Sequence, residues 1–155
     1  MLFAVIRLKG TINVRYDLAK TLDMLRLNRP NHCVLMVPTK ENVGMLDKVG
    51  HMITWGEIDE KTALMLINKR GRITGDQRVT EEYIKNKTGK SLNHVINELV
   101  ECKIKLADIP GMKLVFRLKP PSKGLGTLGL KKQFSMGGAF GYRGKEINSF
   151  LTRMI

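Results

Sequence analysis

Glycines, lysines and aromatic side chains are concentrated between Lys119 and Lys145, and together they could hold phosphate groups. Residues 124–129 read Gly-Leu-Gly-Thr-Leu-Gly, which matches the G-x-G-x-x-G pattern of loops that bind the pyrophosphate of a dinucleotide. Glycine lets backbone amides approach phosphate oxygens, and lysine supplies the opposite charge. The chemistry that the residues suggest is therefore phosphate binding, either in a cofactor or in a nucleic acid backbone.

The cofactor interpretation requires the glycine loop to follow a strand directly and to open a helix. Here Pro120-Pro121-Ser122-Lys123 precedes the motif, and the 26 residues after it are too few to complete a dinucleotide-binding unit. A lone match to the pattern is weak evidence. A small nucleotide-dependent enzyme that uses the 124–129 glycine loop stays an alternative function, and calorimetry with a mononucleotide or dinucleotide would reveal it.

The positive charge of the chain is unevenly distributed. The net charge is +13, from 27 Lys and Arg against 14 Asp and Glu, and no acidic residue lies between Asp108 and Glu146. Self-repulsion of this size destabilises a compact free protein, so a polyanionic partner is expected. We expect an extended segment that orders on contact with RNA. A merely solvated tail is the alternative, but such a tail needs no run free of acids.

The candidate RNA-binding residues form two groups. Those near the C-terminus are cations and aromatic residues that could stack on bases: Lys119, Lys123, Lys131, Lys132, Phe134, Tyr142, Arg143 and Lys145. The second group is Lys69, Arg70 and Arg72, which either complement the dipole of an expected helix or contact phosphates. A duplex-DNA-binding module is a further alternative, but the excess charge falls in a loop, which favours irregular RNA surfaces.

The sequence contains no pattern that marks a catalytic or metal-binding site. His32, His51 and His94 are far apart, and no Ser, Cys or Thr lies in a motif typical of a nucleophile. We therefore expect no catalytic residue, no metal, no cofactor and no small-molecule substrate. No apolar run approaches the roughly 20 residues that a membrane-spanning helix needs, so no membrane partner is expected.

Hydrophobic periodicity predicts the elements that position these residues. Strands are expected at 3–9, 33–37, 51–55 and 113–118, and helices at 16–27, 39–49, 59–71, 80–89, 91–99 and 147–154. The alternation of strand and helix in the first third predicts a small layered sheet with both helices on one face, or a small doubly wound sheet. Residues 119–144 show no period and are expected to form a long loop.

Several segments resemble those of one known family. They are Ile53–Ile58 (ITWGEI), Lys69–Arg72 (KRGR), Phe116–Pro121 (FRLKPP) and Gly141–Gly144 (GYRG). Together they resemble the large-subunit ribosomal protein L thirty family over nearly the whole chain. The length and ending look like the archaeal form, because the eukaryotic counterpart, ribosomal protein L seven, carries a long basic N-terminal extension. The resemblance implies a ferredoxin-like core, contacts with ribosomal RNA through residues that include Arg117, and neither catalysis nor cofactor.

The sequence thus predicts an α+β protein with three segments. Residues 1–58 form a ferredoxin-like split βαβ core, and 59–112 form a helical extension. Residues 113–155 supply a strand, a basic glycine-rich RNA-binding loop and a short C-terminal helix that packs on the core. The expected function is that of a structural constituent of the large ribosomal subunit, cytoplasmic and in the ribosome. Its expected partners are large-subunit ribosomal RNA and neighbouring large-subunit ribosomal proteins.

Overall fold

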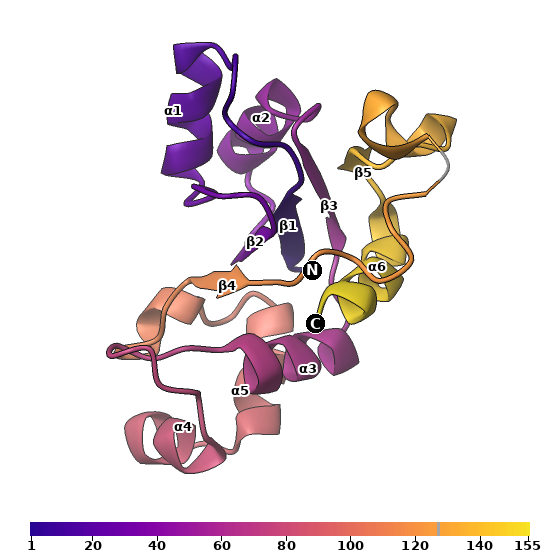
Figure 1. Ribbon diagram of the computed structural model, residues 1–155. Coiled ribbons are helices and arrows are strands. Elements are labelled where there is room, and N and C mark those ends of the chain that lie inside the picture. Colours follow the sequence, from indigo (N-terminus) through magenta and orange to yellow (C-terminus); the bar gives the residue numbers. More distant parts are fainter. Residues whose placement is uncertain (127) are drawn as a thin grey trace.

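The computed structural model describes residues 1–126 and 128–155 as one five-stranded sheet with helices on both faces (Figure 1). Thr127, which belongs to the glycine motif, lies outside the described residues. The strands are β1 (Phe3–Arg7), β2 (His32–Met36), β3 (Ile53–Glu57), β4 (Val115–Arg117) and β5 (Gly141–Tyr142), in the order β4-β2-β1-β3-β5. Strand β1 is antiparallel to both β2 and β3, which flank it. This arrangement is the predicted split βαβ core.

The helices cover both faces of the sheet. They are α1 (Tyr16–Met24), α2 (Lys40–Lys48), α3 (Glu60–Arg70), α4 (Glu81–Thr88), α5 (Leu92–Val100) and α6 (Ile147–Met154). Helices α1 and α2 pack with Val5 and Val34 on one face, as predicted. Ala4 and Ile6 point to the other face, where α3, α5 and α6 pack against them. Because β1 is buried on both sides, its sequence is almost continuously apolar.

Side-chain capping accounts for the starts of α2 and α4, whereas Asp59 and Ser91, which precede α3 and α5, make no side-chain cap hydrogen bond. The side chains of Thr39 and Thr80 accept hydrogen bonds from the amides of Asn42 and Tyr83, as expected for residues that begin helices. Helix α1 ends at Met24, three residues before the predicted end. Arg26 has a left-handed conformation with φ of 60°, and the next amide, that of residue 27, donates to the carbonyl of residue 22. This is a Schellman ending, and the sequence hides it because the left-handed position is not a glycine.

The C-terminal part of the chain differs from the expected extended loop. Residues 119–144 include two short 3₁₀ turns, Gly129–Lys131 and Phe134–Met136, and strand β5, which pairs in parallel with β3. The close approach depends on Gly56, since a Cβ there would lie 2.0 Å from the carbonyl oxygen of Gly144. The final helix, α6, buries its four apolar residues (Ile147, Phe150, Leu151 and Met154), as predicted.

Candidate nucleic-acid interface

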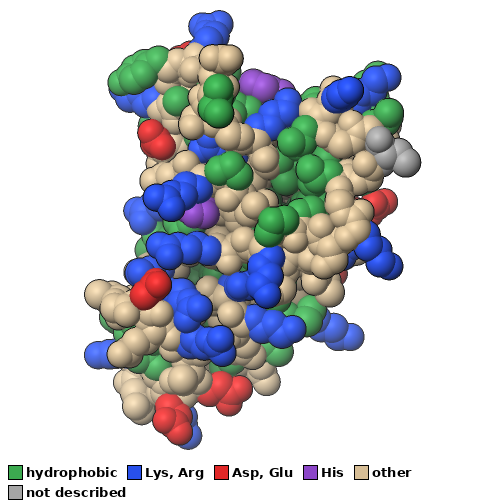
Figure 2. All heavy atoms as spheres, in the orientation of Figure 1, with side chains coloured by type: hydrophobic (Ala, Val, Ile, Leu, Met, Phe, Trp, Pro, Cys, Tyr) green, Lys and Arg blue, Asp and Glu red, His purple; other side chains and the backbone are tan. Residues whose placement is uncertain are grey.

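The pairing of β4 with β2 brings together basic residues from distant stretches of the chain. Arg117 lies directly opposite His32, and the amide of Lys113 donates to the carbonyl of Arg72 at 2.9 Å. Arg29 lies in the turn before β2, where its carbonyl accepts from the amide of His32. We define the cationic face as Arg29, His32, Arg72, Lys113 and Arg117. Figure 2 shows Lys and Arg side chains gathered over β4 and the neighbouring end of α3.

One carboxylate, that of Asp76, lies against the cationic face. The Nζ of Lys113 is 2.7 Å from its Oδ1, and the Nη1 of Arg117 is 3.8 Å from its Oδ2. The hydrogen bond and the charge of Lys113 lower the pKa of Asp76, so the carboxyl stays ionised near neutral pH. Because all three side chains are exposed to solvent, these pairs stabilise the fold little. Lys113 and Arg117 therefore remain accessible to an anion that binds them more tightly than Asp76 does.

The C-terminal end of α6 joins a second set of predicted residues. The Nη2 of Arg70 donates to the main-chain oxygen of Ile155 at 2.7 Å, and the amide of Lys119 donates to the carbonyl of Met154 at 3.0 Å. The side chains of Lys69 and Lys119 are exposed. The basic residues at and just after the end of α3 thus have two roles. Arg70 holds the chain end, and Arg72 lies on the cationic face.

The remaining lysines of the C-terminal segment point to solvent. Exposed positions are Lys123, Lys131, Lys132 and Lys145. Three glycines of the motif, Gly124, Gly126 and Gly129, have positive φ, and a Cβ at any of them would meet no atom within 4 Å. Their backbone is therefore open to solvent on that side. The amides of Gly124 and Gly129 already donate to the carbonyls of Pro121 and Gly126, so the charge of the lysines is what this segment offers to a phosphate.

Arg143 has contacts that the sequence does not reveal. Its guanidinium lies 4.5 Å from the ring centre of Phe134 and 4.4 Å from that of Phe150. Its Nε donates to the hydroxyl oxygen of Thr54 at 2.8 Å, and its Nη2 donates to the carbonyl of Ala139 at 2.7 Å. Burial lowers the pKa of Arg143 to about 10, so the side chain stays charged at neutral pH. Both Arg143 and Phe134 are therefore engaged in joining the C-terminal segment to the core.

Tyr142 is half exposed and lies at the edge of the sheet. Its hydroxyl donates to the carboxylate of Glu57, and this hydrogen bond is the main reason that the pKa of Tyr142 is raised. Its ring centre is 6.4 Å from those of Phe3 and Trp55. With 52% of the residue exposed, part of the ring remains available for stacking on a base.

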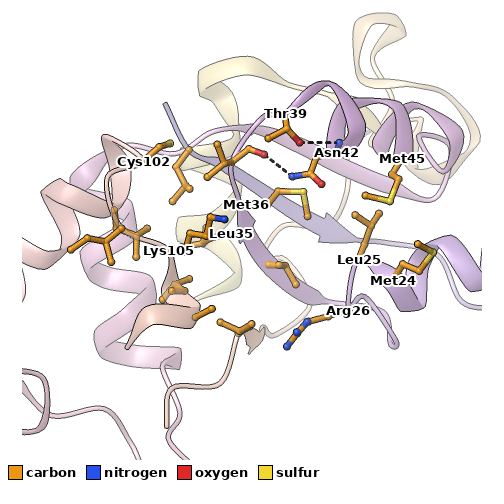
Figure 3. A pocket seen from close by; sticks show the side chains of 18 residues that line it. Met24, Leu25, Arg26, Leu35, Met36, Thr39, Asn42, Met45, Cys102 and Lys105 are labelled. Atoms are coloured by element: carbon orange, nitrogen blue, oxygen red, sulfur yellow. Dashed lines mark hydrogen bonds between the residues drawn. The ribbon is translucent and has the colours of Figure 1, made fainter. Parts of the chain in front are cut away.

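A largely apolar pocket of about 400 Å³ lies between β2 and the segment that follows α5 (Figure 3). Met24, Met36 and Met45 contribute to its lining, and the Nδ2 of Asn42 donates to the carbonyl of Val37 at 2.8 Å. The residues that line it do not include any from 119–155, so the glycine motif does not open into it. This geometry gives no support to the nucleotide-dependent enzyme.

Two further features of the described residues concern metal ions and membranes. Residues 1–126 and 128–155 contain no group of three His, Cys, Asp or Glu side chains placed to hold a metal ion. Within the same ranges, no helix combines the length and apolar character needed to cross a membrane.

Three residues of the cationic face are absent from the predicted set: Arg29, His32 and Lys113. Lys113 carries a sequence signal, because the alternation over 113–118 places it on the same basic outer face as Arg117. His32 and Arg29 carry none. Their proximity to Arg117 results from the register of β2 with β4, strands that are separated in sequence by residues 37–114.

Comparisons with known proteins point to one family. The family described as Ribosomal protein L30p/L7e matches residues 3–53. The large ribosomal subunit protein uL30 of Methanococcus maripaludis is 45% identical over 155 residues, which is 100% of both chains. The proteins of the same name from Nanoarchaeum equitans and Methanoregula boonei are 46% and 44% identical and cover 99% of this chain and of their own lengths. Similarity thus extends from end to end, as predicted for the archaeal form.

Proposed function

The chain belongs to the ribosomal protein L30p/L7e family, and from this premise we propose that it is a structural constituent of the large ribosomal subunit. It binds large-subunit ribosomal RNA next to neighbouring ribosomal proteins, in the ribosome of the cytoplasm. We propose a structural role without catalysis, in which the protein holds ribosomal RNA in one arrangement.

The observation that carries this proposal is the cationic face. Folding places basic residues from three separate stretches of the chain, 29–32, 72 and 113–117, on one surface. Such a surface neutralises several phosphates at once and releases their counterions, which supplies most of the affinity of proteins for nucleic acid. A protein of this kind stabilises RNA where helices converge and their phosphates repel one another.

We propose that the three predicted segments divide this work. Residues 1–58 provide the sheet, 59–112 support its second face, and 113–155 supply much of the RNA contact. The contacting side chains are Lys69, Arg72, Arg117, Lys119, Lys123, Lys131, Lys132, Tyr142 and Lys145, together with the rest of the cationic face. Arg70, Arg143 and Phe134 act indirectly, since their side chains are occupied in contacts that hold the chain end and the C-terminal segment in place.

The double variant Lys131→Glu/Lys132→Glu tests the role of the C-terminal segment. We expect weaker binding to a large-subunit ribosomal RNA transcript and reduced incorporation into subunits, with an unchanged free energy of unfolding because both side chains are exposed. A matched control is Lys20→Glu/Lys48→Glu, which makes the same change of charge at exposed positions on α1 and α2. Equal incorporation of both variants would show that Lys131 and Lys132 do not contact RNA in the subunit.

Co-sedimentation tests the proposed function as a whole. We expect the native protein to sediment with large subunits and to leave them only at high salt, because phosphate contacts weaken as salt rises. A protein that stays in the supernatant at low salt would contradict the proposal.

A further inference from the structure

Three basic residues form a row across one end of the sheet. His32 lies directly opposite Arg117 in the β2–β4 pair. In the β1–β2 pair the register sets Ile6 opposite Cys33, so the next position sets Arg7 opposite His32. Residues directly opposite one another share a face of the sheet, so the charges of Arg7 and Arg117 flank the ring of His32 on that face. The row therefore favours an anion as its partner.

Two atoms of this row are buried without a hydrogen-bond partner among the described residues. They are the Nη2 of Arg7 and the Nδ1 of His32. Arg7 is 1% exposed, and its Nε and Nη1 donate to the carbonyls of Lys9 and Leu27. No hydrogen bond joins the Nη2 of Arg7 to the Nδ1 of His32, but the positive charge of Arg7 near the ring favours a bare nitrogen over an N–H at the buried Nδ1 position. The proton of a neutral His32 then resides on Nε2.

The charged groups that shift the pKa of His32 are all positive. Burial and the charges of Arg117, Arg29 and Arg7 all lower the pKa of His32, so its ring is neutral near pH 7. Asp76 interacts with Arg117, and Asp23 interacts with Arg7, but neither acid is among the groups that shift His32. The side chains of Arg29 and Arg117 are exposed, so an anion has access to both guanidiniums.

We infer that Arg29, His32 and Arg117 form a binding site for one phosphodiester group of an RNA backbone. In this site His32 donates a hydrogen bond from Nε2, and the two guanidiniums supply charge and further donors. Arg7 is a positioning residue, because it holds the ring in the form that can donate outward. The inference rests on the proposed function and adds to it a defined contact.

A phosphate fits this site better than the carboxylate of a neighbouring protein. The two non-bridging oxygens of a phosphodiester sit on a tetrahedral centre and accept hydrogen bonds from directions that do not share a plane, whereas the lone pairs of a carboxylate lie in one plane. The three donors come from the turn before β2, from β2 itself and from β4, and thus approach from different positions on the surface. An acidic protein segment is the competing occupant that the experiments must distinguish.

The first experiment uses inorganic phosphate and the full chain, followed by NMR of the histidine rings. We expect a saturable shift of the His32 signals, with ¹⁵N shifts that show the proton on Nε2. In Arg117→Gln the apparent Kd should rise about three- to tenfold, since an exposed charge-assisted contact is lost. Arg15→Gln removes the same charge at an exposed position outside the site and should leave the Kd unchanged. Equal shifts of His32, His51 and His94, or an unchanged Kd in Arg117→Gln, would overturn the inference.

The second experiment measures binding to a large-subunit ribosomal RNA transcript as a function of salt. Arg29→Gln and Arg117→Gln should each lower the slope of log K against log salt by about 1, and Arg15→Gln should not. His32→Leu should weaken binding, while His32→Gln, which keeps an N–H donor, should retain more of it.

The outcomes separate this site from the proposed function. If the wild-type protein does not bind the transcript, the proposed function is wrong. The phosphate titration then still tests whether Arg29, His32 and Arg117 bind an anion. If the wild-type protein binds while Arg29→Gln, Arg117→Gln and His32→Leu bind equally well, this site alone is wrong. Variants that bind RNA normally but lose a neighbouring ribosomal protein from the assembled subunit would assign the site to an acidic protein segment and would also overturn the inference.

Discussion

The C-terminal basic segment, residues 119–145, and the cationic face acquire their positive charge in different ways. In the segment the cations follow one another along the chain with no acid among them. In the cationic face they come from β2 and the turn before it, from the segment just after α3, and from β4 and the residues just before it, and Asp76 lies against them. The comparison teaches that a run of charge is visible in a sequence, whereas a surface assembled by strand pairing is not.

The two regions also differ in which cations face inward. In the segment Arg143 points into the protein and lies between two phenyl rings, while the neighbouring lysines point outward. Next to the cationic face the inward cation is Arg7, which is buried and lies across His32 from Arg117 in the sheet. Each region therefore has an inward-facing arginine next to an exposed basic surface, and the variants below compare the two surfaces and the anchoring role of Arg143.

Arg143→Ala should have the largest effect. It removes two hydrogen bonds from a charged donor and two cation–π contacts, and should lower the free energy of unfolding by about 3 kcal/mol. Urea unfolding measures this. Arg143→Lys keeps the charge but loses the planar fork, so it should recover only part of the stability. Lys145→Ala, at an exposed position, should stay within about 0.5 kcal/mol of wild type. Equal stability of Arg143→Ala and Lys145→Ala would show that Arg143 does not anchor the segment.

Gly56→Ala should come next. The added Cβ would lie 2.0 Å from the carbonyl oxygen of Gly144, so the C-terminal segment must shift away from β3. Overpacking of this kind should cost about 2 kcal/mol in unfolding experiments. The control, Gly44→Ala, adds a methyl group on α2 where no atom lies within 4 Å, and should stabilise the helix by about 0.5–1 kcal/mol. Changes of the same sign in both variants would contradict the close approach at Gly56.

The two regions can be compared directly by their contribution to RNA binding. Lys113→Gln/Arg117→Gln and Lys131→Gln/Lys132→Gln each remove two charges, one pair from each region. If both regions contact phosphates, each double variant should lower the slope of log K against log salt by about 2 and weaken binding about tenfold. A change in only one of the two pairs would assign the interface to that region.

Asp76→Asn should have the smallest effect, and it should act in the opposite direction. It removes a carboxylate from the cationic face, so affinity for RNA should rise about two- to threefold at low salt. Because the folded protein lowers the pKa of Asp76, the small stabilisation by this acid is present above its unfolded pKa. That stabilisation is lost as pH falls through the folded pKa. In the variant the free energy of unfolding should therefore fall slightly less on acidification than in the wild type. Weaker RNA binding by the variant would mean that Asp76 positions Lys113 for RNA.

Local patterns were sufficient to predict the elements that carry the core. Alternating and helical spacing indicated the regions of strands β1 to β4 and the six α-helices of the described residues. The apolar spacing of Ile147, Phe150 and Leu151 correctly predicted a buried C-terminal helix. The end of α1 was predicted three residues too late, and strand β5 was not predicted. The first depends on a left-handed Arg26, and the second has only two residues, Gly141 and Tyr142, whose strand geometry comes from pairing with β3.

The sequence by itself determined the class of fold, the excess of positive charge and the family, because composition, periodicity and motif residues are properties of neighbouring positions. Only the tertiary structure decided that Arg143 faces inward and that His32 joins Arg29 and Arg117 on one surface. These facts depend on the register of β2 with β4 and of β3 with β5. Such register follows from the burial of whole faces of the sheet, to which residues from every part of the chain contribute.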